Sequence, residues 1–235
     1  MDEQNTPSLR SVVKKVVVVS AVIIGIMFII TTLTWIRTPQ ELYGSRNYLF
    51  ILPIIAILMA ILLISLPFWS PNRRNIVQSA KGYTSAVTAA LLYILGFNIV
   101  IALIYFGAKI IVPAAVLFLF GIMIVIWGNY FGKMRRGFLM GFRTPWTFAS
   151  ELSWDKTHRL VGRLFIAFGL FLILLSAFIG IRPDWVYLAI MIGGMFGICI
   201  YGMVYSYLVW KTDPDRQPAR WHQRPQGSGY TDQAC

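Results

Sequence analysis

The chain has 235 residues, of which 57% are hydrophobic and only 13% are charged. A soluble domain carries roughly 25% charged residues, so a single water-soluble core is excluded, and so is a disordered chain, which would be poor in apolar residues. The formal net charge of +12 could indicate nucleic-acid binding, but no basic stripe accompanies a soluble domain, so we expect no direct nucleic-acid contact.

The apolar residues come in blocks that match the roughly 30 Å hydrocarbon core of a bilayer. The first block follows Lys14 and Lys15 and is longer than the core of a signal peptide, so we interpret it as a retained helix. The sequence therefore predicts an all-α, polytopic six-helix transmembrane bundle, with spans at residues 16–36, 48–69, 85–108, 110–131, 164–181 and 185–210.

The distribution of Lys and Arg predicts the orientation of these spans. Seventeen of the 21 basic residues fall in the termini and the second and fourth loops, and four fall in the other loops. Because cytoplasmic loops carry the excess of Lys and Arg, both termini are predicted to be cytoplasmic. The same basic residues predict attraction to anionic lipid.

Three segments follow from this layout. We predict an N-terminal two-helix module at residues 1–83, a four-helix module at 84–211 with a long loop at 128–163, and a flexible cytoplasmic tail at 212–235 rich in Pro, Gln, Arg and Gly. The short outer connections exclude an external soluble domain. Loops as long as 128–163 are usually functional or disordered, and this one is too apolar for disorder.

Residues for catalysis or metal binding are sparse. Cys199 and Cys235 cannot form a plausible pair, and His158 and His222 show no paired metal-ligand spacing. The predicted spans contain no Asp, Glu, Lys or Arg, which also argues against an ion-coupled transporter. We therefore predict no enzyme activity, no metal and no cofactor.

The long inner loop carries the clearest local signals. Pro145 disfavours helix at Thr144, and either Thr147 or Ser150 can cap a following helix that carries Glu151 in its first turn. We expect that helix to run to Leu160 and to rest at the membrane surface. Its headgroup contacts would come from Trp146 and Trp154, and its phosphate contacts from Arg143, Lys156 and Arg159. The simpler interpretation is an interfacial anchor with no further role.

This loop resembles a known family. The stretches Gly128-Asn129-Tyr130, Gly141-Phe142-Arg143-Thr144-Pro145-Trp146-Thr147 and Trp154-Asp155-Lys156-Thr157-His158-Arg159-Leu160-Val161-Gly162-Arg163 are similar to the signature of the SdpI-type bacterial integral membrane proteins. The residues that match the signature are Asn129, Arg143, Thr144, Pro145, Trp146, Thr147, Trp154, Thr157, His158, Arg159 and Gly162.

The resemblance implies an immunity and signal-transduction protein of the bacterial cytoplasmic (inner) membrane. Its partners would be a secreted peptide toxin outside and a cytoplasmic repressor inside, recruited through the inner loop. The outer loop at 37–47 is shorter than in relatives and lacks the His of their pattern, so its ligand is expected to differ or the protein to have another task.

Alternatives stay open. A small membrane transporter or a lipid- or ligand-binding protein could place Asn98, Tyr93 and the glycines of the last span around a central cavity. The small residues of that span also suit a homodimer contact. They are Ala189, Gly193, Gly194, Gly197 and Gly202. An enzyme acting through His158 and Glu151 is the third class.

Overall fold

The computed structural model describes residues 8–39, 46–69, 80–133, 141–179 and 184–216, and these residues form helices and no strands. The all-α prediction is confirmed. The helices are α1 (Leu9–Arg37), the 3-10 helix η2 (Arg46–Phe50), α2 (Ile51–Trp69), α4 (Ala80–Tyr105), α5 (Val112–Phe131), α6 (Pro145–Ala149), α7 (Glu151–Ser176) and α8 (Asp184–Thr212).

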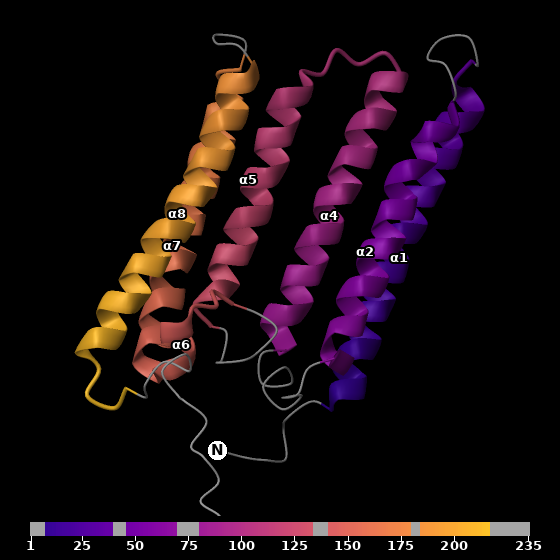
Figure 1. Cartoon of the computed structure of the whole chain (residues 1–235). Coiled ribbons are helices and arrows are strands. Elements are labelled where there is room, and N and C mark those ends of the chain that lie inside the picture. Colours follow the sequence, from indigo (N-terminus) through magenta and orange to yellow (C-terminus); the bar gives the residue numbers. More distant parts are fainter. Residues whose placement is uncertain (1–7, 40–45, 70–79, 134–140, 180–183, 217–235) are drawn as a thin grey trace, which may run out of the picture.

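Six of these helices are long and apolar enough to cross a membrane, as the sequence predicted. They run alternately up and down, side by side in a curved row from the α1–α2 pair through α4 and α5 to the α7–α8 pair (Figure 1). The start of α1, the short helix α6 and the end of α8 lie at the same end of the row. We call this the motif end, because it holds the loop at residues 141–150.

Local chemistry explains where two of the helices begin or end. Ser8 caps α1 by accepting a hydrogen bond of 3.2 Å from the Ser11 amide. Gly107 follows the last turn of α4 with a φ of 89°, a conformation that glycine adopts without steric cost. The turn into α5 is correspondingly short, as the sequence predicted.

The first half of the row is held together by α4. This helix shares a buried core with α1 and α2, formed by Val12, Val16, Ile23, Met27, Ala56, Ala60, Tyr83, Val87, Leu91 and Ile94. The Asn98 side chain donates a buried hydrogen bond of 2.9 Å to the Thr31 hydroxyl of α1. Because α4 also packs on α5, it joins the two halves of the bundle. The predicted division between residues 83 and 84 stays a prediction.

Three helices begin earlier than the predicted spans. Helix α1 starts at Leu9 instead of residue 16, α4 at Ala80 instead of 85, and α7 at Glu151 instead of 164. All three extensions lie at the motif end, where polar residues continue a helix beyond its apolar stretch. The predicted tail beyond residue 216, most of the outer loop 37–47 and the apolar residues 138–140 lie outside the described residues.

Candidate functional site

The loop that leads into α6 is fixed by a pair of threonines. The Thr144 amide donates to the Thr147 hydroxyl oxygen at 3.0 Å, and the Thr147 amide donates to the Thr144 hydroxyl oxygen at 3.2 Å. This reciprocal cap satisfies two backbone donors at the start of α6. Pro145 follows Thr144 in the first turn of α6, where a missing N–H costs nothing. The prediction that Pro145 keeps Thr144 out of a helix is confirmed by the extended backbone of Thr144.

Ser150 separates α6 from α7 and caps the longer helix. Its hydroxyl oxygen accepts a hydrogen bond of 2.9 Å from the Ser153 amide, and its hydroxyl donates to a carboxylate oxygen of Asp213, just after α8. Of the two caps that the sequence left open, Ser150 is therefore the one that starts the helix carrying Glu151.

The expected end of that helix at Leu160 was wrong. Helix α7 continues without interruption to Ser176, so the segment predicted to lie separately on the membrane surface is the first part of a spanning helix. The physical reason is that residues 160–164 contain no proline, and the single glycine among them, Gly162, is tolerated within a helix. The structure gives the five-residue α6 in place of a separate interfacial helix, and a position of that segment at the membrane surface stays a prediction.

His158 lies at the centre of the motif end and ties the loop to α7. Its Nε2 accepts a hydrogen bond of 2.8 Å from the Phe142 amide. An amide N–H can only donate, so Nε2 is unprotonated, and Nδ1–H donates to the Trp154 carbonyl at 2.8 Å. The imidazole is neutral and both ring nitrogens are used.

Aromatic rings enclose this imidazole on both faces. The Trp154 ring stacks on it with a centroid distance of 3.9 Å, and the Phe131 ring of α5 stacks at 5.1 Å. Trp154 and His158 are 0% and 1% exposed. The expectation that Trp154 sits among lipid headgroups was therefore wrong, because its ring is buried within the protein against His158.

Gly141 allows the loop to approach this stack closely. Its φ is 117°, and a Cβ added to it would lie 2.4 Å from His158 Nε2 and 2.9 Å from the Trp154 ring. Both the backbone conformation and the available space require glycine at this position. The loop, the histidine and the tryptophan thus form one packed unit.

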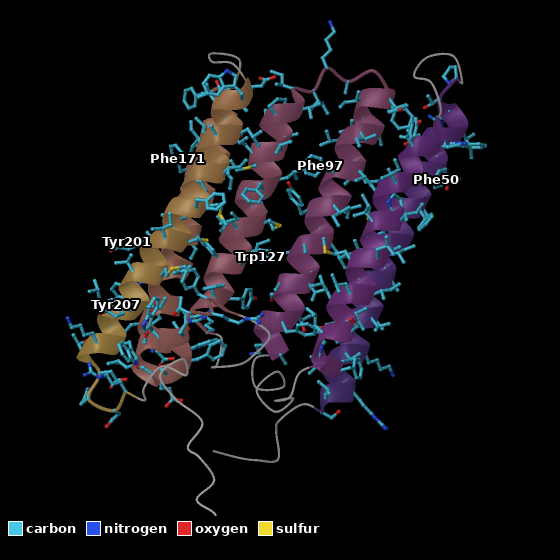
Figure 2. All side chains as sticks on the ribbon, viewed as in Figure 1. Phe50, Phe97, Trp127, Phe171, Tyr201 and Tyr207 are labelled. Atoms are coloured by element: carbon cyan, nitrogen blue, oxygen red, sulfur yellow. The ribbon has the colours of Figure 1, made fainter. Side chains whose placement is uncertain are left out.

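Helix α8 is joined to this unit by buried hydroxyl groups. The Thr144 and Ser206 hydroxyls share a hydrogen bond of 2.9 Å, and the Ser153 hydroxyl donates to the Ser206 carbonyl at 2.8 Å. Trp146 packs edge-on against Tyr207, with a centroid distance of 5.3 Å, near the motif end of α8 (Figure 2). We call the set Thr144, Thr147, Ser150, Ser153, His158, Ser206 and Asp213 the polar latch; every member is buried.

The residues that match the family signature divide into two groups. Thr144, Thr147, Trp154, Thr157, His158 and Gly162 are buried, and the Thr157 hydroxyl has no hydrogen-bond partner within the described residues. Trp146 is half-buried, and the exposed residues are Asn129, Arg143, Pro145 and Arg159. The structure therefore brings most of the signature into one unit at the motif end and leaves Asn129 on the outer side of α5.

Two glycine pairs bring α5 and α7 into backbone contact. A Cβ added to Gly128 would lie 2.6 Å from the Gly162 carbonyl oxygen, and one added to Gly121 would lie 2.7 Å from the Gly169 carbonyl oxygen. Each helix carries its two glycines seven residues apart, close to two helical turns, so both pairs lie along one seam. We call this contact the glycine seam. It explains why the signature needs glycine at 128 and 162.

Several functional candidates escaped the sequence reasoning. Ser153, Ser206 and Asp213 belong to the packed unit but carry no signal by residue type alone. Gly121 and Gly169 could have been found, because each repeats a signature glycine at a spacing of seven residues.

The arrangement offers hydrogen bonding and packing, and Asp213 is the only acidic or basic side chain in the polar latch apart from the neutral His158. Glu151, Asp155 and Lys156 are exposed on α7, and His158 is enclosed by rings. Among the residues that the structure describes, no group of three or more His, Cys, Asp or Glu could hold a metal ion. Glu151 and His158, the pair considered for an enzyme, differ in environment, one exposed and one buried.

The central cavity considered for a transporter is not assembled from the residues proposed for it. Asn98 faces α1 through Thr31, whereas Tyr93 packs edge-on against Phe97 and Phe120. Helix α8 packs mainly on α7 and lies at the other end of the row from α1 (Figure 1). Its glycines therefore do not share a site with Asn98.

Comparison with known protein families gives a match in this part of the chain. Residues 133–206, from just after α5 through most of α8, match the model of the SdpI/YfhL protein family. This part of the chain is similar to the SdpI/YfhL family. The match covers the polar latch from Thr144 to Ser206 and thus overlaps most of the packed unit at the motif end, with Phe131 and Asp213 outside it. Neither a search of curated proteins nor a search of solved structures gave a match.

Proposed function

We propose that this multi-pass membrane protein is an SdpI-like immunity and signal-transduction protein. It would protect its host from a secreted peptide toxin and recruit a cytoplasmic repressor through the loop at the motif end. The observation that carries the proposal is the agreement between the SdpI/YfhL match at residues 133–206 and the buried unit built around His158.

The proposal places the protein in the bacterial cytoplasmic membrane with both termini inside. Its support is the family match together with the excess of Lys and Arg in the termini and alternate loops. In this orientation the motif end faces the cytoplasm, where Arg143 and Lys156 are exposed to a partner. The short turn around Gly107 then faces the toxin.

The proposed mechanism needs no catalysis. A toxin that inserts into the bilayer would bind at the outer helix ends, and α8 would carry the change to the motif end. Helix α8 suits this role because its outer half has open positions at Gly193 and Gly197, while its inner half is hydrogen-bonded to the loop through Ser206. A shift of α8 would therefore act first on Thr144 and on the loop that presents Arg143.

The test is survival of a toxin-sensitive bacterium that expresses the full chain, under challenge by the peptide toxin most closely linked to its host. We expect wild-type protein to protect, and Arg143→Ala and Trp146→Ala to abolish protection at equal amounts of protein in the membrane. Matched controls are Lys14→Ala, an exposed cation at the motif end of α1, and Trp185→Ala, an exposed tryptophan at the far end of α8.

Two results would contradict the proposal at different points. If the wild-type chain gives no more survival than an empty vector, it is not an immunity protein for that toxin. If both loop variants protect as well as wild type, the loop is not required for immunity. Repressor recruitment is measured separately, as toxin-dependent movement of a fluorescent repressor from cytoplasm to membrane.

A further inference from the structure

The exposed side of the glycine seam combines polar, basic and apolar residues in a definite order. The residue that follows each seam glycine is exposed: Ile122 and Asn129 on α5, and Arg163 and Leu170 on α7. Lys133 follows Gly132, whose added Cβ would lie 3.4 Å from the Arg159 Cα, and both Lys133 and Arg159 are also exposed.

The geometry of antiparallel helices places these residues on one side of the seam. Each residue is rotated by about 100° from its predecessor, in the same sense along both chains. In two antiparallel helices the chains run in opposite directions and the contact residues face each other. The residue that follows a contact position therefore points to the same side of the pair in both helices. Asn129 of α5 thus lies beside Arg159 and Arg163 of α7. Lys133 lies in the turn after α5, next to Gly132, and its Nζ is 5.5 Å from the centre of the Tyr130 ring.

The side chains along this surface change character at one level. Toward the motif end they are polar, and three of the four are basic. We call this set, Asn129, Lys133, Arg159 and Arg163, the polar quartet. Two turns from Asn129 on α5, and from one turn beyond Arg163 on α7, the exposed side chains are apolar, namely Phe118, Ile122, Ala167, Leu170 and Leu174.

This change marks the boundary of the hydrocarbon layer. From Arg163 to Ser176, α7 rises about 20 Å at 1.5 Å per residue, within a hydrocarbon core of roughly 30 Å. Helical side chains lean toward the helix N-terminus, which for α7 is the motif end, so the Arg163 guanidinium reaches toward the headgroups. The apolar residues beyond it are at the depth of acyl chains.

We infer that the polar quartet on the α5–α7 seam binds the headgroup of an anionic phospholipid whose acyl chains lie on the apolar residues beyond it. Charge complementarity and the continuous apolar surface select this occupant, since a soluble anion or an acidic protein would use only the polar part. Asp155 lies one turn before Arg159 on α7, but Lys133, Arg159 and Arg163 outnumber this single carboxylate, so the surface remains basic. Asn129, a signature residue outside the polar latch, acquires a role as a hydrogen-bond donor to the headgroup.

The test is native mass spectrometry of the full chain exchanged into micelles with equal amounts of phosphatidylglycerol and phosphatidylcholine of the same acyl chains. We expect wild-type protein to retain phosphatidylglycerol preferentially. The double variant Arg159→Gln/Arg163→Gln should lose that preference by about fivefold per removed charge, the factor that corresponds to about 1 kcal/mol per basic residue. Arg159→Lys/Arg163→Lys should keep most of it.

The matched control is Lys14→Gln/Lys15→Gln, which removes two exposed charges at the same end of the bundle on α1, a helix that does not pack on α5 or α7. Retained preference in this control and loss in the seam variant support the site. Equal retention in both variants, equal loss in both, or displacement of the lipid by inorganic phosphate would overturn it. The unfolding temperature of each variant shows whether a loss of lipid retention comes from the site or from unfolding of the protein. Asn129→Ala should weaken lipid retention without changing the unfolding temperature.

Discussion

Alanine at Gly128 provides the sharpest test of the glycine seam. Its Cβ would lie 2.6 Å from the Gly162 carbonyl oxygen, about 0.8 Å inside the 3.4 Å at which ordinary contacts begin. A backbone oxygen cannot swing away as a flexible side chain can, so α5 and α7 must separate. Overpacking of this kind costs about 1–3 kcal/mol. Alanine also favours the helix by about 1 kcal/mol relative to glycine, which leaves an expected net loss of up to about 2 kcal/mol.

The assay is the free energy of unfolding in mixed micelles titrated with denaturing detergent, measured for Gly128→Ala and for Gly193→Ala. The second substitution makes the same chemical change on α8, where an added Cβ meets nothing within 4 Å. We expect the α8 variant to equal or exceed wild type in stability. Equal stability of the two variants would refute the argument that α5 and α7 are in backbone contact.

Three further predictions concern buried hydrogen bonds, each measured as a change in the free energy of unfolding. His158→Phe keeps an aromatic ring but leaves a loop amide without an acceptor, so we expect a loss of about 1–3 kcal/mol, and a smaller loss would mean that water replaces the ring nitrogen. Ser206→Ala removes the partner of Thr144 and should cost about 1 kcal/mol, with Thr144→Ala adding little in the double variant. Asn98→Leu should cost only about 0.6 kcal/mol, because the bond to Thr31 lies between membrane helices and the amide oxygen has no partner among the residues that the structure describes. A loss above about 2 kcal/mol would contradict this.

The spanning helices were predictable because their signal is local. A run of about 20 apolar residues identifies a span whatever its neighbours are. The helix starts were less accurate, since α7 begins at Glu151 and the apolar stretch begins near Leu164. Polar residues at the motif end keep the helical conformation through caps such as Ser150, and hydropathy does not detect a cap.

The candidate site was predicted in its residues but not in its geometry. Trp154 and His158 were recognised as signature residues within an expected helix. The sequence does not say what these side chains face, and the headgroup position expected for Trp154 was wrong. The approach of Gly141 and Phe131 from other parts of the chain, which buries both rings, is a tertiary contact.

The hydrogen bonds between the loop and α8 could not be predicted for the same reason, since they are tertiary contacts. Ser206 lies 62 residues after Thr144, and a serine in an apolar span has many interpretations. Only the packing of α8 on α7 gives it a partner. The glycine seam had a detectable signal in its repeated spacing, but choosing α5 and α7 as the pair required knowledge of which helices are neighbours.

The seam also limits how the length of this region can change. Inserting one residue between Gly121 and Gly128 would rotate one glycine of the pair by about 100° relative to the other, so only one pair could remain in contact. The same holds between Gly162 and Gly169. We therefore expect insertions and deletions to be rejected within either seven-residue interval, so that the number of residues in these stretches is as restricted as their identity.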